Sequence, residues 1–190
     1  GAVTSAGATL TIRDAGTAAF TGAVNVGTGI VAITDAVTLV DFQGAITAKT
    51  LTVPAGTAAY SFSSTGTGTA ITDAFTPKNT GTMTFGQATG SQTYTGGIDT
   101  TTGLTHSTLT VNGTINTTNT ALKFGDVTLG STTVLDATAS TTAGDLTIGD
   151  VTGAGFSLTL DTGHVTGADI AGGAVTSAGA TLTIRDAGTA

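Results

Sequence analysis

The chain has no cysteine, no tryptophan and no glutamate, and it carries few charges of either sign. Without cysteine it forms neither disulfide bonds nor thiolate metal sites. Charged residues are 9% of the 190 residues, against about 25% in ordinary soluble domains. Glutamate, lysine and arginine favour helices, so their scarcity argues against a helical fold.

The charges that remain are mostly negative. Twelve aspartates against five lysines and arginines give a net charge of −7, and nucleic acids select basic surfaces instead. No stretch reaches the ~18 consecutive apolar residues of a membrane-spanning helix. A mean hydropathy of +0.33 with 39% hydrophobic residues is too apolar for a disordered chain. We therefore expect a folded protein that does not bind nucleic acid.

What the chain does contain points to strands and turns. Threonine makes up roughly a quarter of the residues, and there are 29 glycines. Threonine and valine favour β-strands, while glycine marks turns. The composition therefore predicts an all-β fold.

One segment occurs twice. Residues 1–18, GAVTSAGATLTIRDAGTA, return unchanged as residues 173–190. Identity at a fixed offset is the mark of a repeat architecture. We expect residues 1–172 to be one full tandem unit and 173–190 to be the first coil of the next. Because the chain opens on Gly1, we also expect the true termini of the protein to lie elsewhere.

A shorter period runs inside the long one. Apolar-Thr-apolar triplets and their relatives recur with a spacing close to 19, which fits about nine coils in a unit. The short strands and tight turns predict a right-handed parallel β-solenoid in which each coil stacks on the last. Like residues would then stack on like, and the marker threonines would form one outward ladder: Thr11, Thr34, Thr52, Thr72, Thr110, Thr128, Thr147, Thr166 and Thr183.

The alternative fold is a string of immunoglobulin-like β-sandwiches. Two sandwiches of ~86 residues would fill the unit, near the usual ~100 for that fold. A sandwich of this kind has a core built around a buried aromatic residue, and this chain has no tryptophan and two tyrosines. The solenoid is therefore the preferred prediction.

One segment resembles a known family. Gln92-Thr93-Tyr94-Thr95-Gly96-Gly97, followed by Leu109-Thr110-Val111-Asn112-Gly113, is similar to the passenger-associated repeat of bacterial autotransporters. The motif has Asn where this chain has Gln92, and a shorter gap before the leucine. The whole unit also resembles the β-strand-repeat exoproteins related to filamentous haemagglutinin. The resemblance implies an exported, surface-attached, parallel β-helical stalk.

Three polar residues could form a column on such a stalk. Asp126, Asp145 and His164 follow one another at the spacing of one predicted coil, so stacked coils would place them about 4.8 Å apart. A cation would relieve the repulsion between the two carboxylates. Calcium needs six to eight oxygen ligands, however, which the surrounding threonines supply poorly. We expect a solvated polar edge here, with no metal ion and no cofactor; Ca²⁺ is the alternative.

The predicted function is mechanical. No glutamate, no aligned basic residue and no catalytic triad is present, so we expect no enzyme activity. The unit is expected to be a structural repeat of a long extracellular fibre or adhesin stalk on a bacterial surface. Its partners would be neighbouring repeats and further copies, joined end to end or side by side. The alternative is a ligand-binding solenoid that binds ice through its threonines, or a surface glycan.

Overall fold

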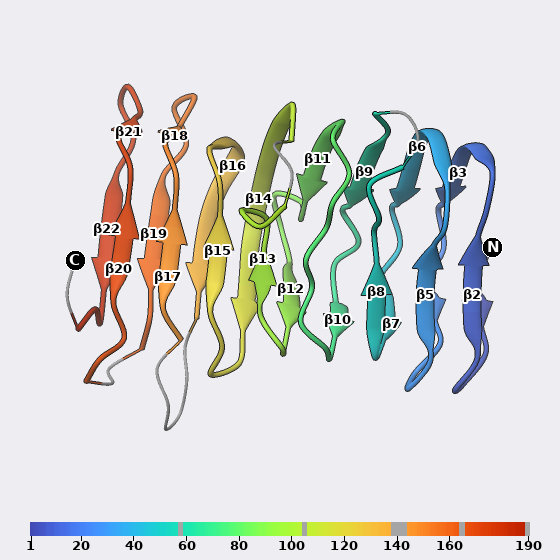
Figure 1. Ribbon diagram of the computed structural model, residues 1–190. Coiled ribbons are helices and arrows are strands. Elements are labelled where there is room, and N and C mark those ends of the chain that lie inside the picture. Colours follow the sequence, from blue (N-terminus) through green and yellow to red (C-terminus); the bar gives the residue numbers. More distant parts are fainter. Residues whose placement is uncertain (57–58, 104–105, 138–143, 164–165, 189–190) are drawn as a thin grey trace.

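The computed structural model describes residues 1–56, 59–103, 106–137, 144–163 and 166–188. These residues form 22 β-strands and no helix, so no helix of the described chain could span a membrane. Figure 1 shows the strands lying side by side along one axis, with the two chain ends at opposite ends of the rod. The predicted parallel β-solenoid is confirmed.

Each turn of the solenoid passes through three columns of parallel strands. Along the chain, a strand of column 1 is followed by a segment in column 2 and then by a strand of column 3, after which the chain returns to column 1. Column 1 consists of β1 (Val3–Thr4), β4 (Val24–Asn25), β7 (Ile46–Ala48), β10 (Thr69–Ile71), β12 (Ser91–Tyr94), the second halves of β14 (Thr108–Thr117) and β16 (Val127–Asp136), β19 (Leu158–Asp161) and β22 (Leu182–Arg185).

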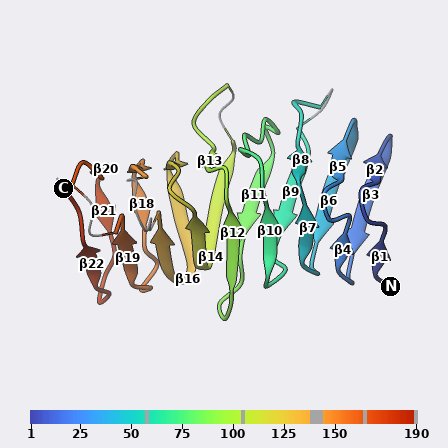
Figure 2. The same cartoon turned by 90° about the horizontal axis from the view of Figure 1, so that it is seen from below.

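Columns 2 and 3 complete each turn. Column 2 consists of two separate ladders. The first is β2 (Thr9–Ile12), β5 (Ile30–Ile33) and β8 (Thr50–Thr52), and the second is β13 (Ile98–Asp99), β15 (Leu122–Phe124), β17 (Leu146–Ile148) and β20 (Ile170–Gly172). In the turn between the two ladders, Phe75 forms an isolated parallel bridge to Ile98. Column 3 consists of β3 (Ala15–Phe20), β6 (Ala36–Phe42), β9 (Ser61–Ser64), β11 (Thr82–Phe85), the first halves of β14 and β16, β18 (Val151–Thr152) and β21 (Val175–Thr176). The columns are seen from below in Figure 2.

The strand pairs of the register are parallel, which excludes the immunoglobulin-like alternative, because sandwiches are built from antiparallel sheets. Most turns are longer than expected, and their lengths differ. Thr110 pairs with Thr128 in the next turn, 18 positions later and close to the expected spacing. Thr82 pairs with Thr108, which lies 26 positions later. Residues 1–172 therefore hold between seven and eight turns instead of the nine that the sequence predicts.

The core follows from the two-residue period of the strands. In β14 every second side chain is buried, because successive side chains of a strand point to opposite faces. The few aromatic residues concentrate inside the rod. Phe20 stacks on Phe42 with ring centroids 4.9 Å apart, and Phe75 stacks on Tyr94 at 5.6 Å. The other aromatic residues of this core are Tyr60, Phe62, Phe85 and Phe124.

Glycine is required where one turn lies directly on the last. The corner before column 3 places Gly149 on Gly125, and a Cβ at Gly149 would lie 2.7 Å from the Asp126 nitrogen and 2.8 Å from the Gly125 carbonyl carbon. The corner before column 1 repeats the arrangement in Gly22, Gly44 and Gly66, each against the backbone of the glycine one turn earlier. A glycine that lies on an earlier turn in this way has no room for a side chain.

Candidate functional site

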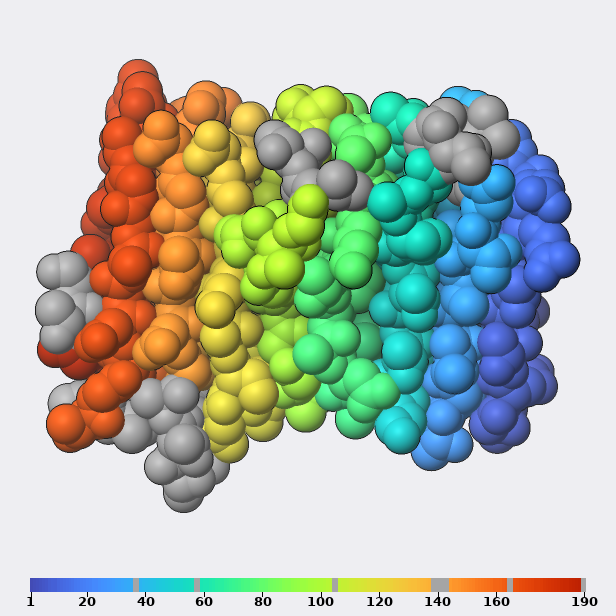
Figure 3. Space-filling model, viewed as in Figure 1, coloured from blue at the N-terminus to red at the C-terminus, as the bar shows by residue number. Residues whose placement is uncertain are grey.

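A polar groove of about 580 Å³ runs along column 3 of the described part of the molecule. Its floor is the outer face of three successive turns, with Thr108, Asp126 and Asp150 in one file and Thr128 and Thr152 beside them. Its wall includes residues of the loop that follows β13, among them Thr100, Thr101 and His106. In Figure 3 the yellow-green part of this segment stands out from the neighbouring turns.

Asp99 holds the start of the groove wall. Its Oδ1 accepts hydrogen bonds from the Thr101 amide (2.8 Å), the Thr101 hydroxyl (2.7 Å) and the Thr102 amide (3.1 Å). Its Oδ2 accepts one from the Thr102 hydroxyl at 2.9 Å. Partial burial tends to raise the pKa of the Asp99 carboxyl, but these hydrogen bonds stabilise the carboxylate and lower the pKa overall.

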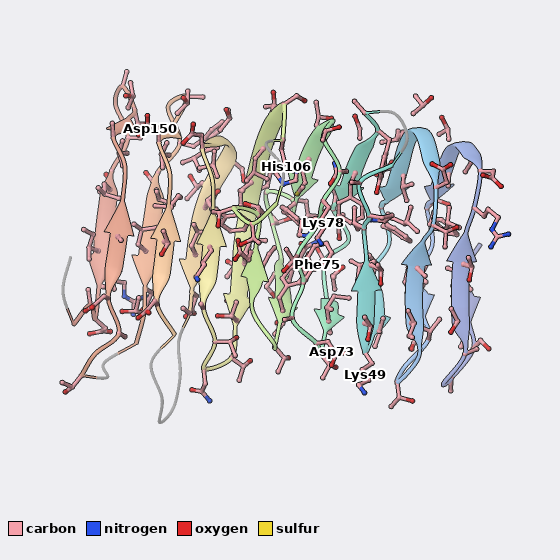
Figure 4. All side chains as sticks on the ribbon, viewed as in Figure 1. Lys49, Asp73, Phe75, Lys78, His106 and Asp150 are labelled. Carbon is pink, nitrogen blue, oxygen red and sulfur yellow. The ribbon has the colours of Figure 1, made fainter. Side chains whose placement is uncertain are left out.

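His106 anchors the other end of the wall. Its Nδ1 lies 2.5 Å from the Asn79 carbonyl oxygen, so Nδ1 carries the proton and donates it. Nε2 is buried without a hydrogen-bond partner among the described atoms. Burial lowers the pKa of His106, and the hydrogen bond to the Asn79 backbone opposes that shift only in part. The hydrogen bond to Asn79 thus ties the wall of the groove to the preceding turn. His106 and Asp150 are both labelled in Figure 4.

The aspartates of the groove floor accept hydrogen bonds from backbone amides of the following turn. Asp126 Oδ1 accepts a hydrogen bond from the Asp150 amide one turn later at 2.9 Å. Asp150 Oδ1 accepts one from the Ala174 amide in the following turn at 2.8 Å. Each carboxylate thus joins two turns where the chain enters column 3. This role leaves the second oxygen of each carboxylate as the one able to meet a ligand.

The expected column of Asp126, Asp145 and His164 is not formed. Asp126 precedes β16 in column 3, whereas Asp145 precedes β17 in column 2 and accepts a hydrogen bond from the Asp169 amide. The reason is the length of the turn, because each aspartate meets the backbone 24 positions further along the chain and not 19. His164 lies outside the described residues. Within the described ranges no group of three or more acidic or histidine side chains could hold a metal ion.

The prediction of a single threonine ladder is also wrong. Its members lie in all three columns or at the corners between them: Thr11, Thr52 and Thr147 in column 2, Thr110 and Thr128 in column 3, Thr183 in column 1, and Thr34, Thr72 and Thr166 outside the strands. A different ladder exists in column 3. It stacks Thr84, Thr110, Thr128, Thr152 and Thr176 in direct register, and two of its members, Thr128 and Thr152, line the groove.

Sequence reasoning missed the buried polar network around Gln92. The Gln92 side chain is 1% exposed, and its Nε2 donates to the carbonyl oxygens of Ser64 (2.8 Å) and Gly66 (3.1 Å). Its Oε1 accepts a hydrogen bond from the Tyr94 hydroxyl at 3.1 Å. The strand pattern signals this network, since Gln92 and Tyr94 occupy the inward positions of β12.

Within the described part of the chain, both ends of the rod are open. Among the described strands, β1, β2 and β3 have strand partners on one side only, and so do β20, β21 and β22. The two copies of the repeated segment show what this exposes. Ile12 is 6% exposed, whereas its copy Ile184 is 47% exposed, and Leu182 beside it is 44% exposed. The C-terminal end therefore presents unpaired strand edges with apolar side chains next to them.

Comparison of this chain with protein-family models, with curated proteins and with solved structures finds no match. The groove, the column-3 threonine ladder and the open rod ends are therefore the features that bear on function.

Proposed function

We propose that the chain is a structural repeat of a long extracellular fibre or adhesin stalk, whose units stack end to end into a continuous rod. The observation that carries the proposal is the identical segment, residues 1–18 and 173–190, at the two ends of an uncapped solenoid. A solenoid needs capping elements where it ends, because each turn buries its faces only against neighbours. A further unit placed on β20–β22 would supply the missing strand partners.

The chemistry of the exposed C-terminal end supports a further unit as its partner. An open strand edge carries unpaired amide and carbonyl groups, which pair readily with another strand. Val175, Leu182 and Ile184 add exposed apolar surface at the same end. Val175 and Leu182 correspond to Val3 and Leu10 in the first copy of the segment. There, a following turn covers them, and each pairs with a valine of that turn. The repeated sequence thus already folds beneath a neighbouring turn of this same protein.

An extracellular surface location belongs to the same proposal. It rests on the resemblance of Gln92–Gly97 and Leu109–Gly113 to autotransporter passenger repeats, together with the parallel solenoid that this resemblance implies.

The association of the purified chain tests the proposal. We expect its mean mass in light scattering to grow with concentration and elongated particles to form in electron micrographs. Ile184→Lys, which places a charge on the exposed end, should remain monomeric. Thr93→Lys, on the outer face of β12 in the middle of the rod, should associate like the parent chain. A parent chain that stays monomeric at millimolar concentration would contradict end-to-end stacking.

The groove along column 3 favours a second candidate function, the binding of a polar ligand such as a surface glycan or ice. Threonines in direct register offer hydroxyl groups at the strand spacing of about 4.8 Å. The neighbouring file, however, is interrupted by Asp126 and Asp150, so two regular threonine files do not run side by side. Thermal hysteresis and a glycan-binding screen test this function; Thr128→Val, at the groove floor, should abolish any activity that depends on it.

A further inference from the structure

The identical segments at residues 1–18 and 173–190 lie in different columns of the solenoid. In the first copy, Val3–Thr4 is in column 1 and pairs with β4, and Thr9–Ile12 is in column 2 and pairs with β5. In the second copy, Val175–Thr176 is in column 3 and pairs with β18, and Leu182–Arg185 is in column 1 and pairs with β19. Both strands are displaced by one column in the same direction.

The third part of the segment is displaced in the same way. Gly16 lies within β3, in column 3. Its copy Gly188 donates a backbone hydrogen bond to Ala168 at 2.6 Å, shortly before β20 of column 2. Each part of the second copy therefore lies in the column that precedes, along the chain, the column of the same part in the first copy.

Two turns of the segment have the same backbone conformation in both copies. Asp14 and its copy Asp186 both have φ of 50°, and Gly7 and its copy Gly179 both have φ of 75°. These positive values are uncommon for non-glycine residues, so their recurrence marks the same turns in both places. The segment carries its own corners, and its column is set by the number of turns between the two copies.

The corners of the solenoid explain why one sequence fits two columns. The segment begins with Gly-Ala-Val-Thr, and Gly1 starts the stack of glycines before column 1 that continues with Gly22. Its copy Gly173 lies on Gly149 in the stack of glycines before column 3. Both corners require a glycine that is followed by a short strand, so the segment satisfies either.

Counting strands gives the size of the displacement. From β1, the chain returns to column 1 seven times, at β4, β7, β10, β12, β14, β16 and β19, and then passes column 2 at β20 before β21 in column 3. The unit thus spans seven turns and two columns. It does not contain a whole number of turns.

We propose that consecutive tandem units are turned about the rod axis by one column relative to each other, so that the polar groove lies on a different side of the rod in each of three successive units. This inference rests on the proposed tandem array. At about 4.8 Å per turn, a unit advances about 37 Å, and the pattern returns to the same side after three units, about 110 Å. The surface that would contact lateral neighbours or ligands is therefore distributed around the whole rod.

Cysteine cross-linking within this chain tests the displacement. The chain has no native cysteine, so introduced pairs are unambiguous. Thr159 and Thr183 are register partners in column 1, and adjacent parallel strands lie within the Cα separation that a disulfide bridges. The Thr159→Cys/Thr183→Cys variant should oxidise to an intrachain disulfide at low protein concentration. The control Ala171→Cys/Thr183→Cys tests the column-2 position that the first copy of the segment occupies, and it should stay reduced.

A disulfide in the control pair, or none in the first pair, would overturn the proposal. The measurement uses dilute monomer, so it is independent of end-to-end association and its failure is distinct from failure of the proposed function. A chain of three units with one labelled Thr93→Cys per unit adds a second readout. Electron micrographs should show the labels on three sides of the rod; labels in one line along one side would refute the displacement.

Discussion

Replacing Gly149 by alanine should strongly destabilise the protein, whereas the same change at Gly125 should not. The two glycines occupy the same corner in successive turns, within Gly125-Asp126-Val127-Thr128 and Gly149-Asp150-Val151-Thr152. A Cβ at Gly149 would lie 2.7 Å and 2.8 Å from backbone atoms of Asp126 and Gly125, while a Cβ at Gly125 meets nothing within 4 Å. Neither glycine has a positive φ, so the pair differs only in the space available.

The expected cost follows from the bonds that the displaced turn would lose. The Gly149 amide donates to the Phe124 carbonyl at 3.0 Å, and the Val127 amide donates to the Asp150 carbonyl at 2.9 Å. The Asp150 amide donates to Asp126 Oδ1 at 2.9 Å. Three hydrogen bonds at about 1 kcal/mol each and about 1–3 kcal/mol for overpacking sum to about 4–6 kcal/mol. Even if part of the displaced turn relaxes, Gly149→Ala should lower the free energy of unfolding by about 3 kcal/mol or more.

Chemical denaturation followed by circular dichroism measures the difference between the two variants. Gly125→Ala should be neutral or stabilise by up to about 1 kcal/mol, because alanine reduces the conformational freedom of the unfolded chain. For a chain of this size, about 3 kcal/mol corresponds to a fall in Tm of roughly 6–12 °C. If the two variants unfold within about 0.5 kcal/mol of each other, the close stacking of glycine corners is refuted.

Three further predictions concern buried and titrating groups. Because the folded pKa of His106 lies below its ordinary value of 6.5, the free energy of unfolding should decline as the pH falls below about 6.5. His106→Gln should remove this decline, so its urea midpoints at pH 7.5 and 5.5 should differ less than those of the parent chain. The pKa of Asp99 is lowered from 3.8, so its stabilising contribution is present above about pH 3.8 and is lost as the pH falls below that value and the folded carboxylate is protonated; Asp99→Asn should reduce the dependence of the free energy of unfolding on pH below about 3.8. Gln92→Leu should cost about 2–4 kcal/mol, because it leaves buried groups of Ser64 and Tyr94 without partners, whereas Thr93→Ala on the outer face should cost less than about 0.5 kcal/mol; equal effects in a denaturant titration would contradict the network.

The fold class was predictable because it depends on local chemistry. Threonine-rich triplets between glycines predict short strands, and the repeated segment predicts an array. The length of a turn was not predictable, since a full turn carries three strands and threonine marks all three columns. Counting threonines therefore measured the spacing of strands from different columns. The resulting average is shorter than most turns, such as the one that joins Thr82 to its partner Thr108.

The groove was beyond sequence analysis for a related reason. Its floor comes from Thr108, Asp126 and Asp150, which lie in consecutive turns but at unequal offsets along the sequence. Such unequal offsets arise from the lengths of corner loops, which no periodic pattern fixes. The sequence selects Asp126 because it lies one predicted coil before Asp145, but its partner depends on register. It consequently meets Asp150, which the predicted spacing did not select.

The hydrogen bonds between turns run along the rod, and this direction determines how such a rod would respond to load. Tension applied along the axis pulls on the ladder between one turn and the next, so turns detach one after another from a loaded end. One turn advances the chain by 24 positions, from Asp126 to Asp150, and a released turn of that length extends by up to about 80 Å in place of a rise of about 4.8 Å. A rod built this way would lengthen in steps under a sustained pull, which limits the force transmitted along it.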